Sequence, residues 1–344
     1  MRILQVITLC ELGGAQSVVA NLANSLCEKH EVLVAAGDGD GKMFELLDSR
    51  IQTKRIDSLV RQISPINELK TILEFRKLYR EFKPDIIHLH SSKAGLLGRL
   101  SFPRSKIVYT VHGFDSIRKA HRIFLPLEKA LQRRCASIIA VSKYDYNNLL
   151  SEGIKKNVSY IHNGVPHQLQ EKAFSEIPYE KKVLSIARLA PPKRFDLFIA
   201  VAEKHPDIGF IWIGNQTIPE YELPPNVFLE GNVPNASRFI GSADVFMLLS
   251  DFEGLPMVLI ESLAAGTPVI ASNVGGISEI IEKEVGAVVS NNVECISNAL
   301  GHILNSNIGE RKKKAVEKYK ELFTVEQMTS KYLDFFNTIY KKNK

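Results

Sequence analysis

Short runs of apolar, often β-branched residues alternate with longer amphipathic segments from one end of this chain to the other. Each run has the length of a strand, and the segment between two runs is long enough for a helix. Strands that are apolar along their whole length are buried on both faces, which is typical of parallel sheets covered by helices. The pattern therefore predicts an α/β fold with doubly wound sheets.

The strand pattern occurs twice. In the first half we expect strands over residues 3–8, 32–36, 86–90, 107–111 and 138–141. In the second half we expect them over residues 183–187, 210–213, 227–229, 245–249, 269–271 and 287–289. Residues 163–182 between these sets are polar and contain Pro178, and 344 residues exceed one ordinary core. We predict domains over 1–165 and 166–325, with a last helix over 326–344 that returns to the first.

Composition narrows the class of protein. Hydrophobic residues make up 45% and charged residues 24%, as in soluble globular proteins. No apolar run approaches the roughly 20 residues of a membrane-spanning helix, and the N-terminus is expected to be a strand rather than a secretory signal. The four cysteines are isolated, which favours a reducing cytoplasm. We expect a cytoplasmic protein, with a peripheral site at the inner face of the cell membrane as a further hypothesis.

Charge is distributed unevenly. Residues 1–165 carry a net charge of +9 and the remainder −3. A basic first half suits an anionic membrane surface or an anionic substrate, and an ordinary solvated surface is an equal alternative; nucleic acid is not an expected partner. Residues 116–134 mix Lys and Arg with apolar residues, which predicts either a membrane-surface helix or a packing helix that buries Phe124, Leu127 and Leu131.

Two glutamates in the second half carry the strongest functional signal. Glu253 lies in a turn after an expected strand, and Glu261 lies on the following helix, about two turns in, with Pro256 in the first turn. Their separation of roughly 12 Å exceeds the roughly 5–9.5 Å of a glycosidase pair, so we expect them to hold different parts of one ligand. The amides of Gly254 and Leu255, expected at the helix N-terminus, suit hydroxyl or anionic oxygens.

Cations and glycines follow other strands. Arg188 ends a strand, and a loop then carries Lys193 and Arg194, which together predict a diphosphate site. Gly13 and Gly14 follow the first strand and open a helix, which favours either a phosphate-facing turn or simply a tight turn.

Histidines end two strands of the first half. We expect His88 and His90 to be satisfied within the fold, whereas His112, before a glycine at a strand end, is a candidate for contact with substrate. No acidic residues with metal-ligand spacing accompany them, so no metal is expected.

Several of these segments resemble the retaining glycosyltransferases of family 4, which have the GT-B fold of two Rossmann-like domains facing a central cleft. The matching segments are EGLPMVLIESLAAGTPVIAS, GGISEII, ARLAPPKRFD, VHGFD, VSKY, HNGV and GGAQ. With HLHSSKAGLLGRL included, the chain as a whole is similar to bacterial enzymes that build capsular polysaccharide or exopolysaccharide.

The resemblance implies roles for particular residues in the second domain. Glu261 would hold the ribose hydroxyls of a nucleotide sugar, and Glu253, with the amides after Gly254, would hold the donor sugar. Arg188 and Lys193 would neutralise the leaving diphosphate in place of a metal ion. The backbone near Val233 would contact the base.

In the first domain, His112 would contact the donor sugar and Gly14 would approach its phosphates. Three positions depart from the family pattern: Ala187 and Arg194 stand where glycines are usual, and Gly214-Asn-Gln216 replaces Gly-x-Gly.

We therefore predict a retaining transferase that moves a hexose or N-acetylhexosamine from a UDP-sugar to a lipid-linked or growing surface polysaccharide. Fixed cations can stabilise the departing diphosphate, so no cofactor is expected. A sugar-nucleotide epimerase of the same fold and a non-catalytic binding module are the alternatives.

Overall fold

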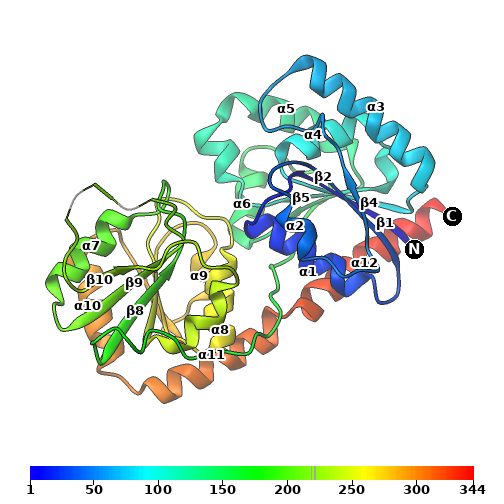
Figure 1. The fold of residues 1–344 in the computed structure, drawn as a ribbon. Coiled ribbons are helices and arrows are strands. Elements are labelled where there is room, and N and C mark those ends of the chain that lie inside the picture. Colours follow the sequence, from blue (N-terminus) through cyan, green and yellow to red (C-terminus); the bar gives the residue numbers. More distant parts are fainter. Residues whose placement is uncertain (218, 221) are drawn as a thin grey trace. The chain divides into compact units, whose positions relative to one another are not determined.

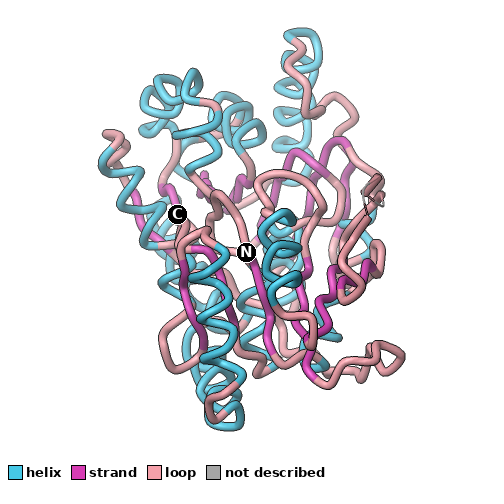
Figure 2. Tube along the Cα trace, turned by 90° about the vertical axis from the view of Figure 1, so that its left-hand side faces the viewer, coloured by secondary structure: helices cyan, strands magenta, loops and turns pink. Residues whose placement is uncertain are grey.

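The computed structural model describes residues 1–217, 219–220 and 222–344, in two compact units (Figure 1). The first unit consists of Met1–Gly164 and Val325–Lys344, and the second of Val165–Thr324. The predicted boundaries differ from these by one residue. Helices and strands alternate along the chain in both units (Figure 2).

The sheet of the first unit is parallel, in the order β3-β2-β1-β4-β5-β6-β7. Its strands are β1 (Arg2–Leu9), β2 (Glu31–Asp38), β3 (Gln52–Arg55), β4 (Ile86–His90), β5 (Ile107–Val111), β6 (Ser137–Ala140) and β7 (Val158–Tyr160). The sequence predicts five of these and misses β3 and β7. Both are short edge strands with one neighbour each, and their residues are partly or fully exposed, so they lack the continuous apolar pattern.

Helices cover both faces of this sheet. Side chains from α3 (Pro65–Phe82), α4 (Ser92–Ser101) and α5 (Leu125–Leu131) share one apolar cluster with alternate strand residues such as Ile87 and Leu89. His88 and His90 point to the opposite face, where α12 (Val325–Asn343) contacts β4 and packs against α1 (Gly14–Leu26). The C-terminal helix is thus part of the first unit's core.

The second unit has a parallel sheet in the order β10-β9-β8-β11-β12-β13. Its strands are β8 (Lys181–Ile186), β9 (Ile208–Ile213), β10 (Val227–Leu229), β11 (Val245–Leu248), β12 (Val269–Ser272) and β13 (Gly286–Val289). Its helices include α7 (Phe195–Lys204), α8 (Met257–Ala265), α9 (Ile277–Ile280), α10 (Val293–Leu304) and α11 (Ile308–Leu322), with the 3₁₀ segment η5 (Ala236–Ser242). All six strands are predicted by the sequence, and both sheets have the doubly wound order of Rossmann-like domains.

The basic segment 116–134 is not one helix. It consists of a π-helical turn (Ser116–Ala120), a 3₁₀ turn (Arg122–Phe124), the helix α5 and a second 3₁₀ turn (Gln132–Arg134). Leu131 is buried, but Phe124 and Leu127 are each 40% exposed. The prediction of a continuous helix is wrong, since a new helix begins at Leu125 and Pro126 lies in its first turn, where proline is tolerated. The prediction that packing buries Phe124 and Leu127 is also wrong.

Among the described residues, no helix is both long enough and apolar enough to cross a membrane.

Candidate functional site

The strand order reverses between β8 and β11 in the second unit, and the loops that follow these two strands are joined. Lys193 and Ser250 form an antiparallel bridge. The amide of Arg194 donates to the carbonyl of Leu249 (3.0 Å), and the amide of Asp251 donates to that of Pro192 (2.9 Å). Ligands of open α/β sheets bind at the carboxyl ends of the strands at such a reversal. The cation motif and the first glutamate therefore lie together where a ligand is expected.

Lys193 and Glu253 form an ion pair through Nζ and Oε1. Ser250 Oγ donates to the same carboxylate oxygen at 2.7 Å. Both charged side chains are largely buried, with 18% and 13% of their surfaces exposed. The second oxygen of Glu253 accepts no hydrogen bond from the described residues, so it has capacity for a ligand hydroxyl.

The turn at Gly275 and Gly276 packs against the turn that carries Glu253. Gly276 N–H donates to the carbonyl of Gly254 at 2.9 Å. Gly275 has φ +60°, and a Cβ built on it would lie 2.0 Å from the carbonyl oxygen of Glu253. Any other residue at position 275 would displace the turn that carries Glu253.

A further polar layer lies under the Ser250 turn. Ser272 Oγ accepts from the amide of Ser250 (2.9 Å) and donates to Asn291 Oδ1 (2.5 Å). Asn291 Nδ2 in turn donates to the Ser250 carbonyl (3.0 Å). Sequence reasoning missed Ser250, Ser272 and Asn291, although they end or closely follow β11, β12 and β13, as the predicted site residues follow other strands.

Glu261 is the fifth residue of α8, because the helix begins at Met257. It therefore lies just over one turn into the helix, and the prediction of two turns is wrong. The side chain is half-buried and has no hydrogen bond or ion pair with the described residues. Burial raises the pKa of Glu261 to about 7.

The same helix start corrects the expectation for the preceding residues. Pro256 is the N-cap residue, with ψ 122°, and does not lie in the first turn. Gly254 and Leu255 lie in the turn before the cap, so their amides are not those of the helix N-terminus. The reason is local: Pro256 disfavours helical geometry in the residue before it.

The other predicted cations differ in availability. Arg188 is exposed and forms no ion pair or hydrogen bond with the described residues. Arg194 is bound on both sides, to Asp196 Oδ2 (2.7 Å) and to Asp251 Oδ1 (3.0 Å). The structure thus leaves Arg188 without a described partner, whereas Lys193 is paired with Glu253 and Arg194 with two aspartates.

Val233 lies in the loop after β10 and is half-buried. This loop is tied to the loop after β9, because Gly214 N–H donates to the carbonyl of Gly231 (2.7 Å) and Gly231 N–H donates to Asn215 Oδ1 (2.9 Å). A Cβ on Gly214 would lie 2.5 Å from the Ala187 carbonyl oxygen. The loops after β8, β9 and β10 therefore meet at one edge of the sheet.

In the first unit, His112 directly follows β5 and belongs to a hydrogen-bonded series. His90 Nδ1 lies 2.9 Å from His112 Nε2, and His90 Nε2 lies 3.1 Å from Gln5 Oε1. Because a carbonyl oxygen only accepts, His90 Nε2 carries the proton and its Nδ1 accepts from His112 Nε2. Burial lowers the pKa of His112 to about 4 and holds the pKa of His90 well below its ordinary value. His112 is thus neutral near pH 7, with Nδ1 as a hydrogen-bond acceptor.

His88 and His90 are completely buried, and His88 Nε2 is hydrogen-bonded to Thr110 Oγ1 at 2.7 Å. The expectation that they are satisfied within the fold is confirmed for His90, which has a partner at both ring nitrogens. It is wrong for His88, whose buried Nδ1 has no hydrogen-bond partner among the described residues. Gly14 is the first residue of α1 and is exposed, with Gly13 in extended geometry before it.

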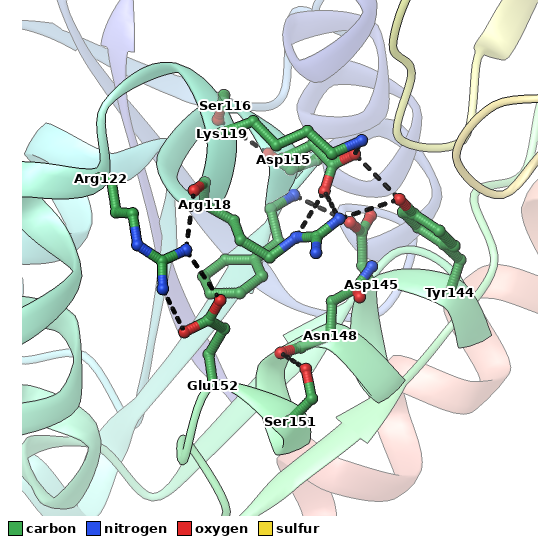
Figure 3. Close-up of polar contacts among 12 residues, drawn as sticks. Asp115, Ser116, Arg118, Lys119, Arg122, Tyr144, Asp145, Asn148, Ser151 and Glu152 are labelled. Atoms are coloured by element: carbon green, nitrogen blue, oxygen red, sulfur yellow. Dashed lines mark hydrogen bonds and ion pairs between the residues drawn. The ribbon is translucent and has the colours of Figure 1, made fainter.

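The loop after His112 is held by a buried carboxylate (Figure 3). Asp115 accepts from Arg118 Nη2 (2.8 Å), Lys119 Nζ (2.8 Å) and Tyr144 Oη (3.0 Å). Burial opposes ionisation of Asp115, but these hydrogen bonds outweigh it and lower its pKa. Phe114 N–H donates to Asp145 Oδ1 at 2.9 Å. The segments VHGFD and VSKY, read separately in the sequence, therefore form one structure beside His112.

Within the described parts of the chain, no three His, Cys, Asp or Glu side chains are grouped so that they could hold a metal ion. The charged groups in the loops after β8 and β11 form two pairs, Lys193 with Glu253 and Arg194 with Asp251, and Arg188 lies nearby in sequence. This arrangement can bind a ligand that has both anionic oxygens and hydroxyl groups.

Two family profiles match the chain in succession. Glycosyltransferase Family 4 matches residues 12–169, and Glycosyl transferases group 1 matches residues 168–322. Together they span both units almost completely.

Individual glycosyltransferases are also similar to this chain over most of its length. The chain is 26% identical over 305 residues to the UDP-Gal:alpha-D-GlcNAc-diphosphoundecaprenol alpha-1,3-galactosyltransferase of Escherichia coli, covering 78% of this chain and 79% of that protein. It is 28% identical over 341 residues to the O-antigen biosynthesis glycosyltransferase WbnH of Escherichia coli, covering 95% and 96%. The structure of Anabaena HepE in complex with UDP-glucose superposes with a TM-score of 0.82 at 19% identity, covering 98% and 100%.

The HepE structure shows a common fold, and the two profiles together cover residues 12–322. The chain belongs to the glycosyltransferases of GT-B fold, with a family 4 first unit and a group 1 second unit.

Proposed function

We propose that this chain is a retaining hexosyltransferase. It moves a hexose or N-acetylhexosamine from a UDP-sugar to a lipid-linked or growing surface polysaccharide. The contact between Lys193 and Glu253 at the strand-order reversal carries this proposal, since it places a cation for phosphate and a carboxylate for sugar hydroxyls side by side. The galactosyltransferase relative, whose name specifies a UDP-sugar donor, supports the choice of nucleotide.

The leaving group determines what the cations do. Breaking a sugar–phosphate bond releases a diphosphate, and fixed cations stabilise the charge that develops on it. Arg188 and Lys193 supply this charge in the proposal, so the transfer requires no metal ion. Activity in excess EDTA is the corresponding test.

Glu253 binds donor hydroxyls in this proposal rather than attacking the sugar. Its Oε1 is already held by Lys193 and Ser250, which lowers its strength as a nucleophile. A front-face transfer assisted by the diphosphate retains the anomeric configuration without a covalent enzyme intermediate. The backbone at Gly254 and Leu255 lies beside the bound sugar.

The remaining donor contacts are assigned by position. Glu261 binds the ribose hydroxyls, and the backbone at Val233 contacts the base. In the first unit, the Nδ1 atom of His112 accepts a hydrogen bond from the donor sugar, and Gly14 allows close approach of a phosphate.

In this proposal the acceptor binds to the first unit, at the cytoplasmic face of the cell membrane. The basic composition of residues 1–165 fits an acceptor that carries phosphate. The Escherichia coli relative acts on a sugar linked through diphosphate to undecaprenol, according to its name.

The test is a panel of UDP-glucose, UDP-galactose, UDP-N-acetylglucosamine and UDP-N-acetylgalactosamine with a diphosphoundecaprenol-linked N-acetylglucosamine acceptor. We expect one or two donors to be used and the new linkage to be α, as determined by NMR. An inverted linkage would refute retention. Release of an epimerised free sugar without acceptor, or UDP binding without turnover across the panel, would refute transfer.

The Glu253→Gln variant tests the role of the carboxylate. We expect transfer to fall about 100-fold to 1,000-fold, as when one transition-state contact is removed, with UDP affinity changed only a few-fold. The exposed Glu203→Gln serves as a control for charge. Loss of UDP binding in the Glu253 variant, with the fold intact, would contradict the assignment.

A further inference from the structure

Ser250 is the neutral partner that holds the carboxylate of Glu253. It is completely buried, and its hydroxyl donates its single proton to Glu253 Oε1 at 2.7 Å. Lys193 contacts the same oxygen, but it is also the cation assigned to the diphosphate. Ser250 has no such second task. The direction of the Glu253 carboxylate in a donor complex therefore depends on how Ser250 is itself held.

A closed ring of hydrogen bonds holds the backbone of Ser250. Its amide donates to Ser272 Oγ at 2.9 Å, and its carbonyl accepts from Asn291 Nδ2 at 3.0 Å. Ser272 Oγ donates in turn to Asn291 Oδ1 at 2.5 Å, which closes the ring. Asn291 thus acts on both sides of Ser250, directly at the carbonyl and through Ser272 at the amide. The ring fixes the rotation of this backbone and, with it, the direction of the Ser250 hydroxyl.

The chemistry of the ring requires an amide side chain at position 291. A carbonyl oxygen only accepts hydrogen bonds, so the atom of Asn291 that faces the Ser250 carbonyl must be the NH₂ group. The Ser272 hydroxyl already accepts from the Ser250 amide, and its own proton goes to the amide oxygen of Asn291. Among side chains of this length only asparagine carries both a donor and an acceptor. Aspartate has the same shape but would place an oxygen against the Ser250 carbonyl.

Asn291 reaches Ser250 from a distant part of the sheet. It follows β13, which lies at the edge of the sheet and is separated from β11 by β12. Its Nδ2 also lies 3.5 Å from Asp251 Oδ1, the oxygen that accepts from Arg194 Nη1 at 3.0 Å. One side chain therefore joins the loop after β13 to the loops after β8 and β11.

The next residue has a purely local role. Asn292 is the N-cap of α10, and its Oδ1 accepts from the amides of Glu294 (3.0 Å) and Cys295 (3.2 Å). The side chain of Asn292 takes no part in the ring. The chain thus contains two adjacent asparagines, one that reaches the site and one that stabilises only its own helix.

We propose that Asn291 is a positioning residue for Glu253. It fixes the Ser250 backbone so that the Ser250 hydroxyl directs the Glu253 carboxylate toward the hydroxyls of the donor sugar. The inference rests on the role proposed above for Glu253. Asn291 itself contacts no ligand, and its effect is confined to the sugar end of the donor. Binding of the nucleotide does not depend on it.

Two variants of Asn291 test this role. Asn291→Ala removes both contacts of the amide, and the isosteric Asn291→Asp replaces the donor to Ser250 by an acceptor. We expect kcat for transfer to fall about 10-fold in each, the scale of one lost hydrogen bond, with the Kd of UDP unchanged within about 2-fold. Thermal unfolding shows that the variants are folded. Unchanged kcat, or a parallel loss of UDP binding, would overturn the proposal.

The matched control is Asn292→Ala. Loss of the cap should lower the stability of the chain but leave kcat unchanged. A control that lost as much kcat as the Asn291 variants would show that loosening of this loop is sufficient, and would refute a specific role for Asn291.

A double variant separates positioning of Glu253 from an independent effect. Glu253→Ala removes the carboxylate, so Asn291→Ala should then lower the residual transfer by less than about 2-fold, because residues that act as a unit are not additive. Radiolabelled donor gives the required sensitivity. A further 10-fold loss in the double variant would show that Asn291 does not act through Glu253.

Hydrogen exchange distinguishes failure of this inference from failure of the proposed function. The Ser250 amide should exchange faster in Asn291→Asp than in the native chain and be unchanged in Asn292→Ala, as measured by NMR. Unchanged exchange in Asn291→Asp would overturn the inference and leave the transferase proposal intact. Absence of transfer by the native chain would refute the proposed function, and the exchange rates would still decide whether Asn291 fixes Ser250.

Discussion

Glu261 shows how burial of one residue alters both stability and binding. Its pKa is raised to about 7, whereas an unfolded glutamate ionises near 4.5. Between pH 4.5 and about 7, Glu261 is ionised in the unfolded state but largely protonated in the native state. Its contribution to the free energy of unfolding therefore falls as pH rises through this interval. Above pH 7 the full cost of a buried carboxylate is present, unless a ligand supplies hydrogen bonds.

We expect Glu261→Gln to remove this dependence. Relative to the native chain, the variant should be more stable at pH 8 than at pH 5 by up to about 3 kcal/mol, which corresponds to the pKa difference. Urea denaturation at the two pH values measures it, with Glu203→Gln as the exposed control. A difference independent of pH would contradict the prediction.

The same group should make nucleotide binding depend on pH. A carboxylate accepts hydrogen bonds from two ribose hydroxyls, whereas the protonated acid loses part of that capacity. UDP affinity should therefore increase as pH rises through about 7 in the native chain and change less in Glu261→Gln. Comparing the two chains cancels the titration of UDP itself.

His90 determines which nitrogen of His112 carries the proton. We predict that His112 is the Nε2–H tautomer and stays neutral from pH 5 to 8, given its pKa of about 4. ¹⁵N NMR of the imidazoles measures both. His90→Asn, whose side-chain oxygen can stand near the position of Nδ1, should preserve this tautomer, and His90→Leu should not. An Nδ1–H tautomer in the native chain would refute the deduction.

At the scale of elements, turns that follow neighbouring strands form the site by contact with one another. The Gly275–Gly276 turn after β12 supports the Glu253 turn after β11, and no Cβ fits between them. The position of the carboxylate thus depends on the packing of two loops.

Gly275→Ala should therefore reduce transfer about as strongly as Glu253→Gln, since the added methyl group displaces the Glu253 turn. Positive φ adds a cost of roughly 1 kcal/mol or more in stability. Gly301→Ala in α10 is the matched control: it has open space around a Cβ and should be neutral or slightly stabilising. Kinetics and thermal unfolding of both variants test this, and normal transfer by Gly275→Ala would refute it.

At the scale of the whole molecule, the first unit is completed by the last helix of the chain. Tyr332 Oη lies 2.9 Å from Thr110 Oγ1, and Phe336 is completely buried against His88. The core of the first unit is therefore completed only after the second unit has been synthesised.

Phe336→Ala should destabilise the first unit by about 3–5 kcal/mol, the usual cost of removing a buried phenylalanine. Native-state hydrogen exchange should show lost protection in β4 and β5 and little change in β8 and β11. Lys331→Ala, on the exposed side of the same helix, is the control. Equal loss of protection in both units would show that they unfold as one.

Local patterns were sufficient for much of this fold. Apolar runs and their polar ends predict the strands that are buried on both faces. They also predict that His112 ends a strand and that Arg188, Lys193 and Glu253 lie in the loops after strands. Edge strands β3 and β7 escaped prediction because their residues are exposed. Local sequence patterns also predicted too early a start for α8 and a single helix over residues 116–134.

The sequence by itself determined two doubly wound sheets and the residues at their carboxyl ends, because burial on both faces leaves a continuous apolar signal. Only the tertiary structure decided that Lys193 pairs with Glu253 while Arg194 turns to Asp196 and Asp251. It also decided the protonation of Glu261 and the tautomer of His112. These properties depend on which strands are neighbours and on how deeply each side chain is buried. Both are determined by residues that lie tens of positions apart in the sequence.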